Sequence, residues 1–215
     1  MFKTMTYFLI ILIASLIIWS VWGFLGSRVE QTEYTVLQRM NGYEIREYPA
    51  HIVAQTLVNE SQRNAMNSGF SIVAGYIFGG NTKKEKIAMT APVVARNNED
   101  KKESEKIAMT APVVATSDGD FQIISFSMPR SYSMETLPTP TDPRVKIVMV
   151  PFKKYAVMRY SWFNSDDRVK SMQQKLQMLL SRDKILSVGS FAYAGYNAPG
   201  TPPWMIRNEV LVEIQ

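Results

Sequence analysis

Residues 34–58 read YTVLQRMNGYEIREYPAHIVAQTLV, a pattern of short strands joined by tight turns. Three segments of this stretch, 34–39, 43–48 and 51–58, are rich in β-branched and aromatic residues, which is typical of strands. Asn41-Gly42, between the first two segments, is a strong signal for a two-residue hairpin turn. The sequence therefore predicts an antiparallel sheet that begins with a hairpin.

A helix is predicted to follow these strands over residues 63–78. Its apolar stripe consists of Ile72, Val73, Tyr76 and Ile77. Gly79-Gly80-Asn81 ends the helix, because glycine readily adopts the backbone conformation that closes a last helical turn. Gly69 and Gly75 weaken the helix but permit close packing, or a ligand near the backbone.

The second half of the chain repeats this order. A strand over 121–128 and a proline-rich crossing over 129–143 lead to strands at 145–150 and 155–162. A second amphipathic helix is predicted over 164–181, and strands at 190–196 and 209–214 close the chain. We therefore expect an α+β fold in which two similar halves, each with one helix, share a curved antiparallel sheet.

One segment of eleven residues, EKIAMTAPVVA, occurs twice, at 85–95 and 105–115. Two copies are too few for a solenoid, which needs at least about three repeats to bury a continuous core. We expect two strand-like copies joined by the polar, charged segment 96–104. Pro92 and Pro112 restrict such strands to edges or bulges.

The N-terminal segment is apolar enough to cross a membrane. Residues 7–25 are interrupted only by Ser15, Ser20 and Gly23, and no charge lies between Lys3 and Arg28. As a helix this run spans roughly 28 Å, close to the hydrocarbon thickness of a bilayer. We expect an uncleaved signal-anchor over 1–26 that crosses the membrane with residues 5–25, a tether over 27–33 and a folded domain over 34–215. A cleaved secretory signal is the alternative.

The charges that flank this helix give its expected orientation. Lys3 and the α-amino group precede it, whereas Arg28 after it is offset by Glu30. The positive-inside rule then places the N-terminus in the cytosol. The expected product is a single-pass membrane protein whose domain is extracytoplasmic, in the periplasm if the source is bacterial.

Composition excludes several classes of function. The chain has no cysteine and one histidine, which excludes disulfides, thiolate nucleophiles, Cys-based metal sites and multi-histidine metal sites within one chain. The net charge of +5 is spread along 215 residues and is too weak to indicate nucleic-acid binding. We expect no nucleic-acid partner.

Several short motifs together resemble the SOUL, or haem-binding protein, family over residues 34–215. The matching passages are YEIREY (43–48), FGGN (78–81), KIAMTAPV (86–93), FSMP (126–129), AGYN (194–197) and RNEV (207–210). Their order and spacing carry the resemblance. It implies a distorted antiparallel β-barrel or curved sheet of two pseudo-symmetric halves, each with one packed helix, in agreement with the segment analysis.

The resemblance also implies binding of haem or another tetrapyrrole, a flat hydrophobic ligand, without catalysis. In the family the cleft lies between the first helix and the loop that joins the last two strands. The positions that correspond here are Ile72, Val73, Tyr76 and Ile77 on the helix, with Tyr196, Pro199, Pro203 and Trp204 in and beside the loop. Arg63 and Arg207 are candidate partners for the propionates. The loop commonly carries a lysine in haem-binding members, and residues 197–206 here contain none.

Other interpretations of these residues stay open at this stage. The stripe on the first helix is also what packing against a sheet would require. His51 is a candidate axial ligand for iron, or an exposed histidine at a strand start. The chain could instead be a structural or protein-interaction module with a vestigial cleft. It could also be an enzyme on a small hydrophobic substrate, with Glu44 and Glu209 as candidate acids that lack a visible partner.

Overall fold

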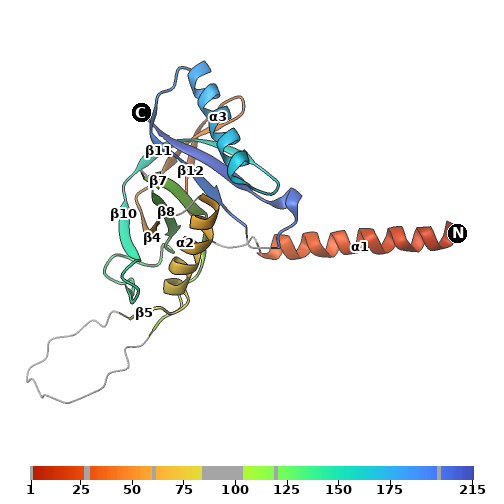
Figure 1. The fold of residues 1–215 in the computed structure, drawn as a ribbon, viewed down its shortest axis with the longest axis horizontal. Coiled ribbons are helices and arrows are strands. Elements are labelled where there is room, and N and C mark those ends of the chain that lie inside the picture. The colour runs from red at the N-terminus through yellow and green to blue at the C-terminus, as the bar shows by residue number, and fades with distance from the viewer. Residues whose placement is uncertain (1, 27–29, 60–61, 84–103, 119–120, 198–199) are drawn as a thin grey trace, which may run out of the picture.

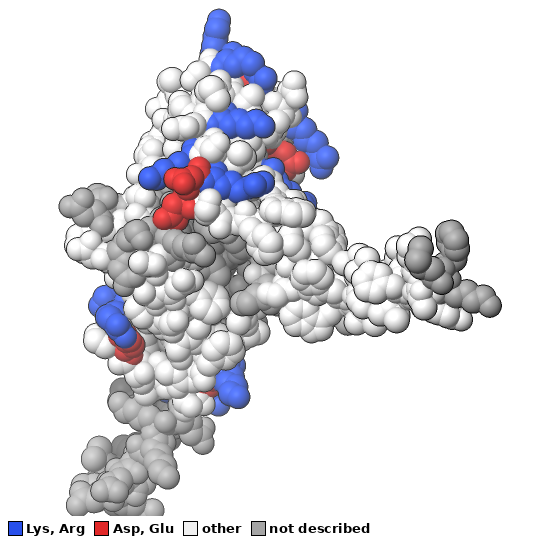
Figure 2. Space-filling view, turned by 45° about the vertical axis from the view of Figure 1, so that its right-hand side comes forward, with Lys and Arg blue, Asp and Glu red and all other residues white. Residues whose placement is uncertain are grey.

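A long N-terminal helix projects from a domain built on one large sheet (Figure 1). The structure is a computed structural model that describes residues 2–26, 30–59, 62–83, 104–118, 121–197 and 200–215. The projecting helix, α1, runs over Phe2–Gly26. Its segment Thr4–Phe24 has a mean hydropathy of 2.2 and is long and apolar enough to cross a membrane. Figure 2 shows the part of α1 that is not grey as a rod without charged side chains, beside a domain with scattered Lys, Arg, Asp and Glu.

The sheet has nine strands in the order β10-β4-β8-β7-β12-β13-β11-β3-β2. Their bounds are β2 Thr35–Arg39, β3 Glu44–Tyr48, β4 His51–Val58, β7 Val113–Asp118, β8 Phe121–Ser127, β10 Lys146–Val150, β11 Lys153–Tyr160, β12 Ser187–Gly195 and β13 Asn208–Ile214. All eight pairings in this sheet are antiparallel. Among the described strands, β10 and β2 are edges, so the sheet does not close into a barrel.

The two halves of the chain are related by a pseudo-twofold arrangement. In the first half β4, the helix α2, β7 and β8 follow one another, and β8 lies between β4 and β7. In the second half β11, the helix α3, β12 and β13 follow one another, and β13 lies between β11 and β12. Each half also contributes one strand that pairs with the other half: β3 of the first half pairs with β11, and β10 of the second half pairs with β4. The expected α+β fold of two similar halves is confirmed.

Both helices pack on the same face of the sheet. α2 (Gln62–Ile77) covers β4, β8 and β7, and its buried side chains meet Ala54, Ile124 and Phe126. α3 (Asp166–Arg182) covers β11, β12 and β13, and Ser165 caps it by accepting a hydrogen bond from the Arg168 amide. Each helix therefore buries its own apolar core, one in each half.

Short segments beside the sheet attach the remaining chain to it. β1 (Glu30–Gln31) pairs in parallel with β6 (Thr110–Ala111), and β5 (Asn81–Thr82) pairs with β9 (Thr139–Pro140). Residues 30 and 31, which the sequence assigned to a tether, thus lie against the domain. A three-residue turn, η1 (Pro203–Met205), lies between β12 and β13.

The second copy of the repeated segment enters the sheet only at its end. Ile107 is buried under α2, and the strand structure begins at Thr110. Pro112 lacks an amide hydrogen and follows a cis peptide bond, and it separates β6 from β7. The first copy, at 85–95, with its expected strand, lies outside the described residues.

We predict that alanine has opposite effects at the two glycines of α2. A Cβ atom at Gly69 would overlap the side chain of Ile124, and overpacking a core typically costs about 1–3 kcal/mol. A Cβ atom at Gly75 would meet nothing within 4 Å, so Gly75→Ala gains about 0.5–1 kcal/mol of helix stability. Thermal unfolding of the detergent-solubilised protein measures both. Equal shifts for the two variants would contradict the close packing of α2 on β8.

Candidate functional site

The sheet face opposite the helices forms a groove. Side chains alternate along a strand, so Val53 and Gln55 of β4 point away from α2 while Ile52 and Ala54 pack beneath it. On the other strands too, every second side chain points to this face and lines the groove. The concave groove is lined by Thr32, Tyr48, His51, Val53, Gln55, Pro112, Val114, Thr116, Ile123, Ser125, Ser127, Val150, Tyr155, Ala194, Tyr196 and Leu211.

The groove is large enough for part of a small molecule, and it continues along the sheet. Its volume is about 220 Å³, and an adjoining hollow of about 310 Å³ shares Val114, Thr116, Ile123, Tyr155 and Leu211 with it. Typical ligand pockets measure about 300–1,000 Å³, so the two hollows together reach that range. The shared residues are mostly aliphatic or aromatic, which suits a flat apolar ligand.

Three tyrosines form one wall of the groove. Tyr48 and Tyr155 meet edge to face with ring centroids 5.6 Å apart, and Tyr196 lies close by with 8% of its surface exposed. Burial raises the pKa of Tyr48 and of Tyr155 to about 12, because a low-dielectric surrounding disfavours the phenolate. Burial also raises the pKa of Tyr196 far above its ordinary value. The wall therefore stays neutral across the physiological pH range.

A buried charge cluster lies directly behind this wall. Glu209 is fully buried, and its carboxylate accepts hydrogen bonds from the Arg46 guanidinium at 3.0 Å and from Arg207 at 2.8 Å. The Tyr196 hydroxyl donates to the same carboxylate at 2.6 Å. Arg46 also pairs with Glu44 at 2.8 Å, so two carboxylates balance two guanidiniums. The cluster is electrically neutral and holds Tyr196 in the groove wall.

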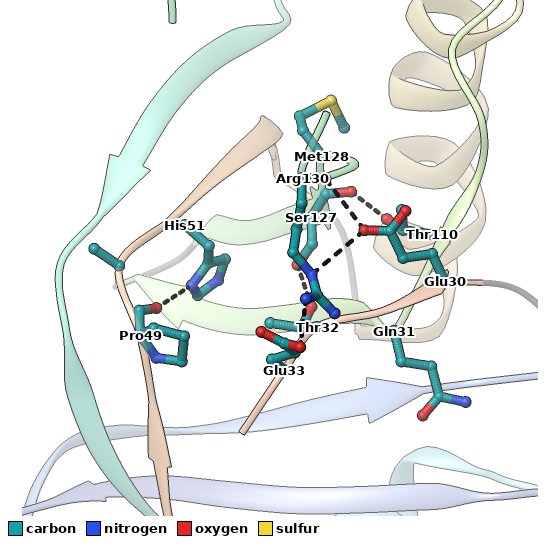
Figure 3. A pocket seen from close by; sticks show the side chains of 11 residues that line it. Glu30, Gln31, Thr32, Glu33, Pro49, His51, Thr110, Ser127, Met128 and Arg130 are labelled. Atoms are coloured by element: carbon teal, nitrogen blue, oxygen red, sulfur yellow. Dashed lines mark hydrogen bonds and ion pairs between the residues drawn. The ribbon is translucent and has the colours of Figure 1, made fainter. Parts of the chain in front are cut away.

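The mouth of the groove is polar and contains the single histidine. Figure 3 shows His51 with its Nδ1 2.9 Å from the carbonyl oxygen of Pro49. A carbonyl can only accept, so Nδ1 is the donor of this bond, and in that tautomer the lone pair of the ring is on Nε2. Across the mouth, Arg130 forms ion pairs with Glu30 and Glu33.

The structure places the predicted helix residues on the other side of the sheet from the groove. Val73, Tyr76 and Ile77 have 0–1% of their surfaces exposed and belong to the core beneath α2. The Tyr76 hydroxyl donates to the carbonyl oxygen of Pro138. Ile72 is partly buried against the same core. These four side chains therefore pack the helix onto the sheet.

The predicted loop residues separate into two groups. Tyr196 lines the groove, and Arg207 lies behind it, with its guanidinium 3.8 Å from the centre of the Tyr196 ring. Pro203 is buried in η1, whereas Trp204 is 46% exposed and packs against Trp19 of α1. The side chain of Arg63 and all of Pro199 lie outside the described residues.

Sequence reasoning missed the main walls of the groove, although a signal for it exists. Strand segments 51–58 and 121–127 carry apolar residues on both faces of the sheet. Ala54 and Ile124 face α2, and their neighbours Val53 and Ile123 face the groove. In this fold α2 and α3 both cover the same face of the sheet. Apolar residues on the other face therefore indicate either a further layer or a ligand-binding concavity.

We predict that Glu209→Gln strongly destabilises the domain. The substitution keeps the shape of the side chain but leaves the buried Arg46 and Arg207 guanidiniums without their shared anion, which typically costs about 3–5 kcal/mol. Denaturant unfolding measures the loss. As a control, Asp142→Asn breaks the surface pair with Arg144 and should change stability far less. Equal effects would contradict the structural role of the cluster.

We also predict a loss of stability at alkaline pH. A phenol ionises at pH 10 in the unfolded chain, but the pKa of Tyr48 is about 12 in the folded domain. Its contribution, about 2–3 kcal/mol, is complete below pH 10 and disappears as the pH rises to 12. Tyr48→Phe removes this term and should lose less stability over that interval. Identical pH profiles for the two proteins would contradict the prediction.

Comparison with solved structures supports the fold. The C-terminal domain of EcmrR shares 8% identity with a TM-score of 0.52, over 85% of this chain and 98% of that one. A hydrolase from Listeria innocua shares 11% identity with a TM-score of 0.50, over 83% and 94%. EcmrR in a complex with DNA shares 9% identity with a TM-score of 0.53, over 83% and 59%. At these identities the likeness concerns the fold alone.

Comparison with protein families is more specific. No curated protein matches the chain. The family model described as SOUL heme-binding protein matches residues 29–105 and 95–213, which together include almost the whole domain. Its two matches overlap at 95–105, from the last residue of the first copy of the repeated segment to the first residue of the second. The chain belongs to the SOUL heme-binding protein family.

Proposed function

We propose that this protein is a membrane-anchored, non-enzymatic binding protein that holds haem or a related flat tetrapyrrole in the concave groove. The observation that carries the proposal is the groove itself: an apolar concavity on the helix-free face of the sheet in a member of a heme-binding family. A flat apolar ring gains most from burial against such a surface.

The residues present fit such a ring. Aliphatic side chains, among them Val53, Ile123 and Leu211, form the floor, and tyrosines form one wall. Cationic side chains lie at both ends of the groove: Arg130 at its mouth and Lys153 beside the adjoining hollow. Each forms an ion pair with a glutamate. Either can hold an anionic substituent of the ring by charge-assisted hydrogen bonds.

His51 is the protein ligand that an iron-containing ring would use here. It lines the groove, and the Nδ1 hydrogen bond to the backbone of Pro49 fixes the tautomer that leaves Nε2 available. Metal-binding histidines usually donate their other ring nitrogen in this way. A tetrapyrrole without iron would use the same apolar walls and would not need His51.

A non-enzymatic role agrees with the state of the candidate acids. Glu44 and Glu209 converge on Arg46, a partner that the sequence did not reveal. Both carboxylates are bound in ion pairs, and Glu209 is fully buried behind the groove wall. Neither is positioned to donate a proton to a ligand in the groove.

The membrane part of the proposal rests on α1. Its segment Thr4–Phe24 is long and apolar enough to span a bilayer, and no other described helix is. By the positive-inside rule we propose a cytosolic N-terminus and an extracytoplasmic domain. The proposed partners are then the lipid bilayer and a small hydrophobic ligand, with no nucleic acid.

Hemin titration of the detergent-solubilised full-length protein tests the ligand and its location. We predict a saturable shift of the Soret band. Ser125→Leu fills the groove floor and should weaken binding on the order of tenfold or more, equivalent to about 1.4 kcal/mol. His51→Ala should alter the Soret position. Trp204→Ala, outside the groove, is the matched control and should bind as the parent does.

The outcomes separate the possible sites. A loss of binding in Trp204→Ala or Ile72→Ala, with Ser125→Leu unaffected, would place the ligand in the cleft between α2 and the loop instead. Absence of a saturable Soret shift in the parent would remove haem as the ligand.

A further inference from the structure

An exposed cluster of aromatic side chains lies where α1 meets the domain. Trp204 of η1 is 46% exposed, and Trp162 and Phe163, between β11 and α3, are 49% and 61% exposed. We call these three residues the aromatic patch. None of them lines the groove. Large aromatic side chains normally seek burial, so three exposed ones on two segments that contact each other indicate a contact with something outside the chain.

The two segments that carry the patch are fastened together. The Trp162 amide donates to the carbonyl oxygen of Pro203 at 3.1 Å, and the Asn208 side chain donates to the carbonyl oxygen of Trp162 at 2.8 Å. These bonds hold Trp162 at a φ of 84°, a conformation that bulky side chains rarely adopt. Glycine would be relaxed there, so the tryptophan places its exposed ring at this position at the cost of backbone strain, and such strain is typical of functional positions.

The patch is also tied to α1. The rings of Trp19 and Trp204 meet edge to face with centroids 5.4 Å apart, and Trp19 Nε1 donates to the carbonyl oxygen of Gly200 at 2.8 Å. Gly23 allows the approach, because a Cβ there would lie 2.5 Å from Pro202. The loop and η1 therefore rest against the last turns of α1, as the position of the turn in Figure 1 also indicates.

This contact sets the depth of the patch in a membrane. Trp19 precedes Phe24, the end of the candidate span, by five residues, or about 7.5 Å along the helix. The interfacial layer on each side of a bilayer is roughly 5–7 Å thick, so a helix whose span ends at the outer edge of that layer has Trp19 at its inner edge. Trp204, at the level of Trp19, cannot stand clear of the lipid if α1 spans it. Tryptophan is enriched at this depth because its ring is apolar and its indole nitrogen is polar.

Several backbone polar groups of the loop between β12 and β13 have hydrogen-bond partners within the protein. The carbonyl oxygens of Gly200, Pro202 and Pro203 all accept hydrogen bonds within the protein, and the two prolines carry no amide hydrogen. These backbone groups therefore need no water partner when the loop enters a lipid interface. On the face in Figure 2, the described surface next to α1 shows no charged side chain, while Lys and Arg lie farther away.

We propose that the aromatic patch inserts into the interfacial layer of the same bilayer that α1 crosses, and so holds the domain against the membrane in one orientation. This inference rests on the proposed membrane span of α1. The occupant of the patch is lipid, because Trp204 packs against α1, the one described helix that is long and apolar enough to cross a bilayer.

Quenching of single tryptophans by brominated lipid tests the proposal in the full-length protein. The chain has four tryptophans, and replacing three at a time with phenylalanine leaves Trp22, Trp162 or Trp204 as the one reporter. Leu186→Trp, without the four native tryptophans, reports from the far end of α3. The vesicles contain phosphatidylcholine brominated near the headgroup end of its acyl chains. We expect Trp162 and Trp204 to lose as much fluorescence as Trp22, and the Leu186→Trp reporter to lose none.

Quenching of Trp22 without quenching of Trp162 and Trp204 would overturn the inference and leave the anchor intact. Absence of quenching at Trp22 would overturn both, because α1 would then not span the bilayer. Hemin binding in detergent is independent of either result and so tests the ligand separately. Circular dichroism confirms that each phenylalanine variant is folded, and a quenching loss in the Leu186→Trp protein equal to that of Trp204 would contradict a fixed orientation.

Discussion

Among the described helices, α2 and α3 cover the nine-stranded sheet, and both lie on one face. Successive side chains of a strand point to opposite faces of the sheet. The apolar side chains on the face without helices therefore need another partner. Curvature brings Val150 of β10 and Tyr155 of β11, from opposite parts of the sheet order, to the same hollow. The uncovered face thereby becomes a concavity rather than a flat apolar surface. The groove follows from this imbalance between the sheet and its helices.

The buried charge cluster connects the groove to the rest of the molecule. Glu209 of β13 joins Arg46 of β3 to Arg207, and Arg207 reaches Gln31 and Tyr34 near the start of the domain. Burial by itself would lower the pKa of Arg46, but the Glu209 carboxylate raises it above its ordinary value. The guanidinium thus stays charged and bonded. Through Arg207 and Glu209, Gln31 and Tyr34 in the segment after α1 are connected to Tyr196 in the groove wall.

Local patterns in the sequence predicted the strands, both helices and the two-half architecture. Asn41-Gly42 marked the first hairpin, and the apolar stripes of residues 63–78 and 164–181 marked α2 and α3. The exchange of β3 and β10 between the halves was not predictable, because no local pattern encodes which distant strand a hairpin joins. The alternation of side chains along the strand at 51–58 likewise shows which residues share one face of the sheet. It does not show which of the two faces a helix covers.

The candidate site was predicted less completely for the same reason. Tyr196 and His51 were identified and do line the groove, but its floor was not identified, since Ile123 and Leu211 look like ordinary core residues in sequence. Trp204 was singled out as an aromatic on a proline-rich loop. Its partner, Trp19, lies on the N-terminal helix, far away in sequence, and only the folded chain shows that contact.

Methyl NMR spectroscopy of the full-length protein with protoporphyrin shows directly whether the groove holds the ligand. A bound macrocycle shifts the resonances of the methyl groups beneath its ring. We expect large shifts at Val53, Ile123 and Leu211, which line the groove, and small ones at Val73 and Ile77 beneath α2. Large shifts confined to Val73 and Ile77, with the groove methyls unchanged, would contradict binding in the groove.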